Sequence, residues 1–478
     1  MEDELLAQRR EKLDRLRADG IDPFPHAYPG VETIASVRAA HEGLADGEET
    51  EVTHRVAGRI AARRGQGKMA FIDLVDRSGR IQLQARLDVL GEETHQRLLG
   101  LDLGDLIGID GTAFMSRRGE LTLRVDGFDV LAKSLRPPPD KHHGLADIET
   151  RYRQRELDLI ANEESRDLFI ARAKIISAIR RTLDDDGFVE VETPTLVSLY
   201  GGALAKPFQT HFNALHQDMY LRIATELYLK RLIVGGLERV YELGKNFRNE
   251  GLSPRHNPEF TMIEWYEAYA DYLDETERVE QVVRAAATAI DYQGELKVFE
   301  PWARITLRDA VLQQTGIDVL EHRERDALAA AIGDRLPTDG RTWPQLVDDL
   351  LGAFVEPTLQ QPTFLLDYPV ELSPFAKRHR EIEGLTERFE AYVCGIEIAN
   401  AFTELNDPDD QRERFEAQVR YAGEGDDEAQ PYDESYVRAL EHGMPPTGGV
   451  GVGIDRLTMI LTGRETIREV ILFPALRD

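Results

Sequence analysis

The chain of 478 residues is long enough for two or three domains with a sizeable core, and its 30% charged and 42% apolar residues are an ordinary soluble composition. It has no apolar run of membrane-spanning length, its start is unlike a signal peptide, and its single cysteine, Cys394, excludes internal disulfides and cysteine-based zinc sites. We therefore expect a cytoplasmic protein with no membrane partner. The formal net charge of −29 argues against nucleic-acid binding, because phosphate contacts need Lys and Arg, so any such site requires a local basic patch.

The first predicted element is a helix over residues 3–19 that ends at Gly20. Basic side chains cluster along it: Arg9, Arg10, Lys12, Arg15 and Arg17. The cluster is either a solvated charged face or one wall of an RNA-binding surface. We assign residues 1–48 to an N-terminal helical extension.

The second region changes to short strands in which apolar and polar residues alternate. The strands are predicted at Val52–Ile60, Ala70–Val75, Ile81–Arg86, Leu106–Phe114 and Leu121–Val130. Five short strands in about 80 residues suit a small β-barrel of OB type. We place this domain at residues 49–135.

One face of the predicted barrel carries an aromatic ring among polar residues. Ile72 and Leu74 point to the core, whereas Phe71 points the other way. Basic and amide side chains lie near it in the sequence: Arg63, Arg64, Lys68 and Gln82. Such a patch suits single-stranded nucleic acid, and a half-buried ring at a barrel mouth is the alternative.

A proline-rich linker separates this barrel from the rest of the chain. Three consecutive prolines, Pro137 to Pro139, favour a stiff, extended polyproline conformation. We place the linker at residues 136–155 and a second domain at residues 156–478.

The second domain opens with a helix and a strand. Apolar spacing predicts the helix over Phe169–Leu183 and the strand at Phe188–Val191. Further along, a strand at Met219–Ile223 precedes a helix at Glu226–Ile233, where Glu226 could simply complement the helix dipole. Residues 272–365 are predicted to be helical connections around a short strand-like segment, Ile305 to Leu307, without identifiable chemistry.

The most informative stretch runs from Arg239 to Tyr266 and joins two strands by a long polar loop. On the second strand four side chains share one face: Phe260, Met262, Glu264 and Tyr266. The loop carries Arg248, Asn249, Glu250, Arg255, His256 and Asn257. A solvated surface loop is the plain alternative. Arginine forks bind phosphate and an aromatic face holds a base, so we favour a site for an anionic planar ligand such as a nucleotide.

Two further segments concentrate polar residues on predicted strands. Strands at 389–393 and 397–404 turn near Gly395 and carry Glu390, Glu397, Asn400, Phe402 and Glu404. Buried carboxylates need cations or metal, although a surface-facing strand is the alternative. The glycine-rich strand from Gly448 leads into a helix with Arg456 at its start, and it matches neither a Rossmann nor a P-loop fingerprint.

These segments together resemble the class II aminoacyl-tRNA synthetases, in the form typical of the lysyl enzyme. FRNEG followed by RHNPEFT is similar to motif 2, GFVEVETPTL to motif 1, and GGVGVGIDR with the tail TIREVILFPA to motif 3. The resemblance implies an α+β protein with an N-terminal OB-type β-barrel and a catalytic domain built on an antiparallel sheet flanked by helices. It also implies a homodimer formed through motif 1.

The resemblance further implies a ligase that activates lysine with ATP and transfers it to the 3′ end of tRNA(Lys). Arg248 and Arg456 would be the catalytic cations. ATP would be held by Arg248, Glu250, Arg255, His256, Asn257, Phe260, Glu390 and Arg456, with adenine between Phe260 and Arg456. Mg²⁺ would bind to Glu390 and Glu397.

Lysine has two ammonium groups, so its pocket needs two anionic ends. The resemblance assigns lysine binding to Gly202, Glu226, Glu264, Tyr266, Asn400, Phe402 and Glu404, with Glu226 at the α-amine and Glu404 at the ε-amine. A carboxylate at the far end excludes aspartate and asparagine. In the barrel, Phe71 would stack an anticodon base while Arg64, Gln82 and Glu120 read base edges.

Two rival functions stay open at this stage. A ligase that lysylates proteins would keep the catalytic motifs but, by the same resemblance, would lack the OB domain. A pure nucleic-acid-binding protein would need neither the arginine-rich hairpin nor the pair Glu390 and Glu397.

Overall fold

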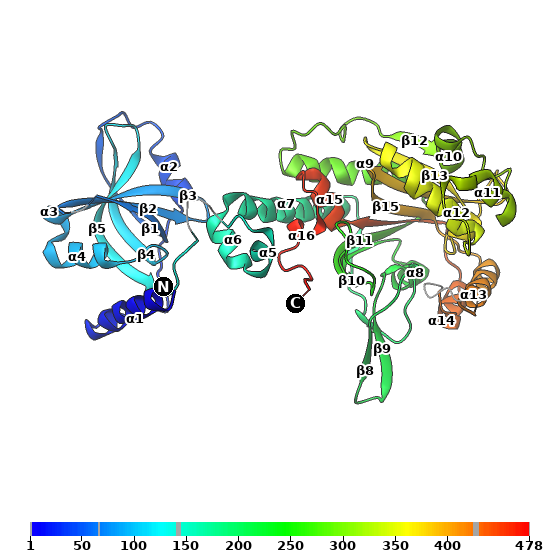
Figure 1. Ribbon diagram of the computed structural model, residues 1–478, viewed down its shortest axis with the longest axis horizontal. Helices are drawn as coiled ribbons and strands as arrows, with labels where there is room; N and C mark the ends of the chain where they lie inside the picture. The colour runs from blue at the N-terminus through cyan, green and yellow to red at the C-terminus, as the bar shows by residue number, and fades with distance from the viewer. Residues whose placement is uncertain (1, 66, 140–144, 424–429, 478) are drawn as a thin grey trace. The chain divides into compact units, whose positions relative to one another are not determined.

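Two compact units make up the chain, Met1–Ala146 and Asp147–Asp478. The computed structural model describes residues 2–65, 67–139, 145–423 and 430–477 (Figure 1). Within these ranges no helix is both long enough and apolar enough to cross a membrane.

The first unit contains a closed five-stranded barrel, which confirms the predicted architecture. Its strands are β1 (Glu49–Arg64), β2 (Met69–Asp76), β3 (Gly79–Arg86), β4 (Leu106–Met115) and β5 (Leu121–Ala132), and they pair in the order β1-β2-β3-β5-β4. Apolar and polar side chains alternate along the strands, so that the apolar ones point inward. Four of them are fully buried in the barrel core: Ile72, Leu74, Ile81 and Leu83.

Helices surround this barrel within the same unit. They are α1 (Glu2–Ala18), α2 (Ile34–Ala40), α3 (Leu87–Leu90) and α4 (Glu92–Gly100), of which only α1 was predicted. The basic cluster of α1 is partly used inside the unit: Arg9 donates to the Leu103 carbonyl at 3.1 Å, and Lys12 pairs with Asp102 at 2.5 Å. These two side chains therefore anchor α1 and are not free for RNA.

The second unit is built on a mixed, mostly antiparallel sheet of eight strands flanked by helices, as predicted for the fold class. The strands are β6 (Val189–Glu190), β10 (Arg239–Phe247), β11 (Glu259–Ala268), β12 (Ala303–Thr306), β13 (Thr363–Pro369), β14 (Leu385–Val393), β15 (Ile396–Thr403) and β16 (Thr447–Gly453). Their order is β12-β13-β14-β15-β16-β11-β10-β6, so β16 lies between strands that precede it by many residues.

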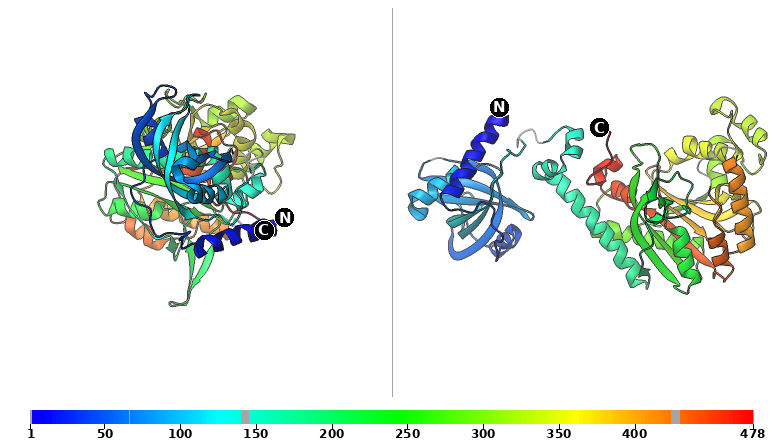
Figure 2. Two further views of the ribbon diagram at one scale, coloured as in Figure 1. Left: turned by 90° about the vertical axis from the view of Figure 1, so that its left-hand side faces the viewer. Right: turned by 90° about the horizontal axis from the view of Figure 1, so that it is seen from below.

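Helices cover one face of this sheet (Figure 2). They are α7 (Glu163–Asp185), α9 (Tyr272–Ala289) and α15 (Ile454–Leu461). Their apolar residues, such as Ile179, Val282 and Leu457, form one cluster with the sheet residues Tyr241 and Trp265. The opposite sheet face is therefore the one that can hold polar side chains.

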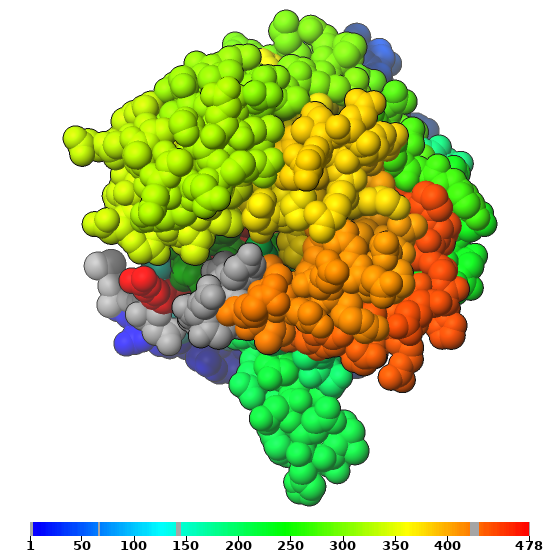
Figure 3. Space-filling view, turned by 90° about the vertical axis from the view of Figure 1, so that its right-hand side faces the viewer, coloured from blue at the N-terminus to red at the C-terminus, as the bar shows by residue number. Residues whose placement is uncertain are grey.

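Further helices and a small sheet also belong to the unit. They are the helices α5 (Ile148–Arg153), α6 (Arg155–Ala161), α8 (Glu226–Val234), α10 (Leu307–Thr315), α11 (Arg325–Ile332), α12 (Trp343–Leu350), α13 (Pro408–Gly423), α14 (Glu434–Leu440) and α16 (Ile467–Val470), and a small sheet of β7 (Leu196–Val197), β8 (Gln209–Phe212) and β9 (Gln217–Leu221). The β8–β9 hairpin projects from the second unit as a narrow arm (Figures 1 and 3).

The structure corrects the prediction for residues 272–365 in two places. The strand-like segment ends one residue earlier than expected, because Thr306 caps α10 by accepting a hydrogen bond from the Asp309 amide. The start of β13, a completely buried strand at Thr363–Pro369, also lies in this range and was not predicted. The predicted strand Phe188–Val191 is reduced to Val189–Glu190 at the sheet edge.

Candidate active site

A cavity of about 440 Å³ opens over the polar face of the eight-stranded sheet. Strands β11, β14, β15 and β16, helix α8 and the loop between β10 and β11 all contribute to its wall. The lining includes every residue that was predicted to bind ATP, lysine or magnesium: Gly202, Glu226, Arg248, Glu250, Arg255, His256, Asn257, Phe260, Glu264, Tyr266, Glu390, Glu397, Asn400, Phe402, Glu404 and Arg456.

Strand pleating brings these side chains to one face. On β11 the alternating residues from Phe260 to Tyr266 face the cavity, while Ile263 and Trp265 enter the core. The glycines of β16 keep the cavity open, because a Cβ at Gly449 would lie 2.0 Å from Oε1 of Glu404. Any side chain there would displace this carboxylate.

Two buried carboxylates and an ammonium group mark one end of the cavity. Glu226 opens α8, Glu404 follows β15, and Nζ of Lys230 contacts both of them, at 2.5 Å for Oε1 of Glu226. All three side chains are almost completely buried. Burial raises the pKa of Glu226 and of Glu404, and the neighbouring ammonium opposes this effect.

A third carboxylate, Glu264, lies at the same end. Its Oε1 accepts a hydrogen bond from the Thr225 amide at 3.1 Å, and its Oε2 accepts one from the Tyr266 hydroxyl at 3.3 Å. Burial, followed by repulsion from Glu226, raises the pKa of Glu264 to about 7. The end of the cavity is thus strongly acidic, which suits a cationic ligand.

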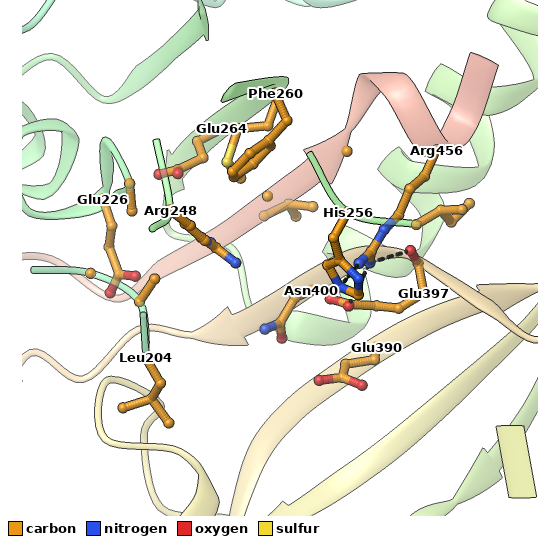
Figure 4. A pocket seen from close by; sticks show the side chains of 18 of the residues that line it. Leu204, Glu226, Arg248, His256, Phe260, Glu264, Glu390, Glu397, Asn400 and Arg456 are labelled. Carbon is orange, nitrogen blue, oxygen red and sulfur yellow. Dashed lines mark hydrogen bonds and ion pairs between the residues drawn. The ribbon is translucent and has the colours of Figure 1, made fainter. Parts of the chain in front are cut away.

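The other end of the cavity is cationic. Arg456 donates through NH1 to the Glu397 carboxylate at 3.0 Å, and its NH2 lies 2.9 Å from Nε2 of His256. Figure 4 shows this group opposite Glu226, with Arg248 and Asn400 between the two ends. Burial and then the charges of the nearby arginines lower the pKa of His256, so its ring is neutral at pH 7.

Arg248 stands over the ring of Phe260, with its guanidinium carbon 5.1 Å from the ring centroid. This is cation–π geometry. The adenine sandwich between Phe260 and Arg456 stays a prediction, and Arg248 contacts one face of the Phe260 ring. A base would therefore take the other face or displace the guanidinium.

The remaining loop residues have structural partners as well. Arg255 donates to the Gly395 carbonyl at 2.9 Å, which ties the loop to the β14–β15 turn. The Asn257 amide donates to the Glu259 carbonyl and accepts from the Ala475 amide at 3.3 Å. Asn257 thus borders the cavity, but both polar atoms of its side chain bind backbone groups. Glu250, in contrast, is exposed at the rim of the cavity.

The carboxylates of Glu390 and Glu397 fit a divalent cation by their chemistry. Burial and repulsion from Glu390 raise the pKa of Glu397, so a cation between them would relieve an unfavourable pair. Tyr368 and Tyr392 donate to Oε2 of Glu390 at 2.8 and 2.6 Å and orient it. No group of three acidic, histidine or cysteine ligands occurs among the described residues, so phosphate and water would supply the other ligands.

Two cations at this cavity escaped the sequence-based prediction: Arg388, which lines it, and Lys230, which contacts the lining residues Glu226 and Glu404. Lys230 stands four residues after Glu226, and this helical spacing on an apolar helix was the available signal. Arg388 alternates with Glu390 on β14, binds its Oε1 at 2.5 Å and reaches Oδ1 of Asn400 at 3.2 Å. Both are almost completely enclosed cations that order the anionic side chains around them.

The barrel residues predicted to bind RNA lie on adjacent strands of the first unit. Arg64 pairs in register with Phe71, and it donates to Oε1 of Gln82 at 3.1 Å. Arg64 also pairs with the buried Asp73, which lowers the net positive charge of this face. Glu120 is held by Arg38 at 3.0 Å, a partner that the sequence did not indicate. Phe71 is half-buried.

Comparisons with known proteins agree with this geometry. A family model described as tRNA synthetases class II (D, K and N) matches residues 147–477, and one described as an OB-fold nucleic acid binding domain matches residues 54–131. The chain is 53% identical over 485 residues to a lysine–tRNA ligase of Roseiflexus castenholzii, covering 99% of each chain. It is 49% identical to lysine–tRNA ligases of Bacillus subtilis (99% of this chain, 97% of the relative) and Moorella thermoacetica (100% and 98%).

Proposed function

The chain belongs to the class II tRNA synthetases of the group D, K and N, and we propose that it activates lysine with ATP and ligates it to tRNA(Lys). The observation that carries the proposal is the division of one cavity into an acidic end at Glu226, Glu264 and Glu404 and an end that carries the arginines Arg255 and Arg456 around the neutral ring of His256. Lysine carries two ammonium groups and one carboxylate, and ATP carries a triphosphate, so each substrate has a matching end.

In the first step, a carboxylate oxygen of lysine attacks the α-phosphorus of ATP and pyrophosphate leaves. Two anions must approach each other, and Arg248 lies between the two ends of the cavity, where it would neutralise both. No protein base is required, because the attacking carboxylate is already ionised at pH 7. The contribution of the protein is positioning and charge stabilisation.

In the second step, a ribose hydroxyl at the 3′ end of tRNA attacks the carbonyl carbon of lysyl-adenylate and AMP leaves. The acyl group thereby passes from phosphate to ribose, with lysine held by the same carboxylates. The OB-fold barrel is the unit that we expect to hold the anticodon, through Phe71 and its polar neighbours.

Lysine selection would rest on the acidic end of the cavity. Glu226 with the backbone of Gly202 would hold the α-ammonium, and Glu404 with Tyr266 the ε-ammonium. Asn400, Phe402 and Glu264 would complete the pocket. Oε1 of Glu404 has no hydrogen-bond partner among the described residues although it is buried, which suits an ammonium ligand.

The reaction also uses magnesium in our proposal, with Glu390 and Glu397 as its protein ligands. When bound, the ion supplies charge neutralisation for the phosphates. Arg388, Tyr368 and Tyr392 would hold the Glu390 carboxylate in place for it.

Lysine-dependent exchange between pyrophosphate and ATP, measured with and without tRNA, tests this function. A lysine–tRNA ligase exchanges pyrophosphate with lysine alone and charges tRNA(Lys) when it is added. Exchange without charging would favour a ligase that lysylates another acceptor. If lysine caused no exchange of pyrophosphate with ATP, the proposal would be refuted. The result would then favour the rival function, a pure nucleic-acid-binding protein.

We further propose a cytoplasmic homodimer built on residues 169–196. Strand β6 lies at an edge of the sheet, and the apolar side chains of Ile170, Val189 and Leu196 are 49, 50 and 41% exposed. An exposed strand edge with apolar neighbours suits pairing with a second copy. Light scattering at micromolar concentration should give the dimer mass, whereas a fully active monomer would contradict this assembly.

A further inference from the structure

Lys230 is a buried cation to which the proposed reaction assigns no part. Its side chain is 0% exposed, and its ammonium contacts Glu226 of its own helix and Glu404 after β15. Residues 230 and 404 are far apart in the chain, so the contact joins two walls of the cavity. A buried lysine is expensive unless it is paired, and this one has two carboxylate partners.

The charged and titratable groups that face this cluster come from several elements. Glu264 and Tyr266 lie on β11, Tyr436 on α14, and Arg388 on β14. Arg388 is already paired with Glu390, and Lys230 lies 5.2 Å from the ring of Phe375. Among the described residues, Lys230 therefore supplies the ammonium group that directly contacts the carboxylates of Glu226 and Glu404.

The charge count of the cluster is informative. When bound substrate holds all three carboxyls in their ionised form, Glu226, Glu264 and Glu404 together with the one ammonium carry two net negative charges, which equals the number of ammonium groups on lysine. Burial is the largest cause that raises the pKa of each carboxyl, and Lys230 opposes this effect for Glu226 and Glu404. Despite burial, the two carboxylates hold the pKa of Lys230 above its ordinary value, so the cation persists.

We propose that Lys230 is a positioning residue that sets lysine specificity by keeping the carboxylates of Glu226 and Glu404 ionised and aimed into the cavity. The inference rests on the proposed function. Oε1 of Glu226 and Oε2 of Glu404 face Lys230, which leaves the second oxygen of each carboxylate for the substrate. The internal ammonium thereby removes one surplus negative charge without occupying the space of the ligand.

The test is the pH dependence of lysine use in Lys230→Met, a change that removes the charge and keeps an unbranched chain. Without the ammonium of Lys230, Glu226 or Glu404 is expected to hold a proton at neutral pH, and that proton must leave because each of these two carboxylates receives one ammonium group of the substrate. The KM for lysine in pyrophosphate exchange, divided by the wild-type KM at the same pH, should fall by up to about tenfold per unit as the pH rises from 6.5 to 8.5. The ratio cancels titration of the substrate amines.

Two control variants separate charge from packing. Lys230→Arg retains a cation, so its KM ratio should not depend on pH, whatever its overall level. Lys133→Met removes an equally buried lysine, which bridges Asp102 and Asp105 at 2.8 and 2.9 Å in the barrel unit. This variant should lose stability but leave the KM for lysine at the wild-type value at every pH.

The outcomes distinguish this inference from the proposed function. A falling ratio for Lys230→Met with an unchanged KM for ATP supports the positioning role. A ratio that is constant with pH, in a folded variant whose wild-type parent exchanges pyrophosphate with lysine, overturns the inference alone. If the Met variant does not fold, Lys230→Gln makes the same comparison. A wild-type protein without lysine-dependent exchange refutes both.

Discussion

Nε2 of His256 and NH2 of Arg456 lie 2.9 Å apart, and the same histidine holds Ser253 through Nδ1 at 2.8 Å. Since a guanidinium can only donate, Nε2 must accept, and the proton of the neutral ring resides on Nδ1. Motifs 2 and 3 are therefore connected through a neutral imidazole.

This contact gives a prediction for the titration of His256. Burial and then the positive charges of Arg456, Arg248 and Arg255 lower its pKa, so the ring should titrate below about 6.5. Histidine-labelled protein followed by NMR would report the midpoint. Arg456→Gln should move it upward, because the nearest cation is lost. A His256 midpoint above 6.5 in the wild type would contradict the neutral assignment.

The second prediction concerns Glu404→Gln. The change leaves the ε-ammonium of lysine in a buried pocket without its counter-charge, and truncation of such a pair costs about 2–5 kcal/mol. The KM for lysine in exchange should rise steeply while the KM for ATP holds. Glu387→Gln is the matched control, since Glu387 is equally buried but is paired with Arg380 outside the cavity. Lysine kinetics within about threefold of wild type would remove Glu404 from the pocket.

Arg248→Ala separates chemistry from binding. The guanidinium meets charge that accumulates as the carboxylate reaches phosphorus, so the loss should appear in kcat more than in the KM for either substrate. Steady-state exchange at saturating lysine and ATP measures it. A pure increase in the KM for ATP would instead make Arg248 a ground-state clamp.

Phe71→Ala tests the barrel. One stacked base contributes about 1–3 kcal/mol, so the KM for tRNA should rise roughly tenfold or more. Lysine-dependent exchange should stay at the wild-type level, because the adenylate forms in the other unit. Phe128→Ala, a change at a half-buried ring of β5 packed on the barrel core, controls for stability. Unchanged tRNA kinetics with an unchanged Tm would return Phe71 to a packing role.

The sequence predicted best what depends on local periodicity. The barrel strands and the face from Phe260 to Tyr266 alternate with period two, and the structure has strands at all these positions. Strand β13 was missed because all seven of its residues are buried, which removes alternation. The bend at Asp367, with φ of 63°, further obscures the pattern.

The cavity was predictable in its members but not in their pairing. The family resemblance supplied the roles of Glu226 and Glu404, whereas the contact that joins them through Lys230 links α8 with the end of β15. No local pattern encodes a contact across so many residues. The same holds for Arg38 and Glu120, whose ion pair joins α2 to the start of β5.

The place of β16 in the sheet also bears on how the molecule is made. Strands β6, β10 and β11 precede residue 269, β12 to β15 precede residue 404, and only β16, at residues 447–453, pairs with both β11 and β15. During synthesis the edges of β11 and β15 therefore stay unpaired, and the two halves of the sheet cannot join, until β16 has left the ribosome. A nascent chain that lacks residues 447–453 cannot complete the sheet that carries the ligand cavity, and its unpaired strand edges favour aggregation.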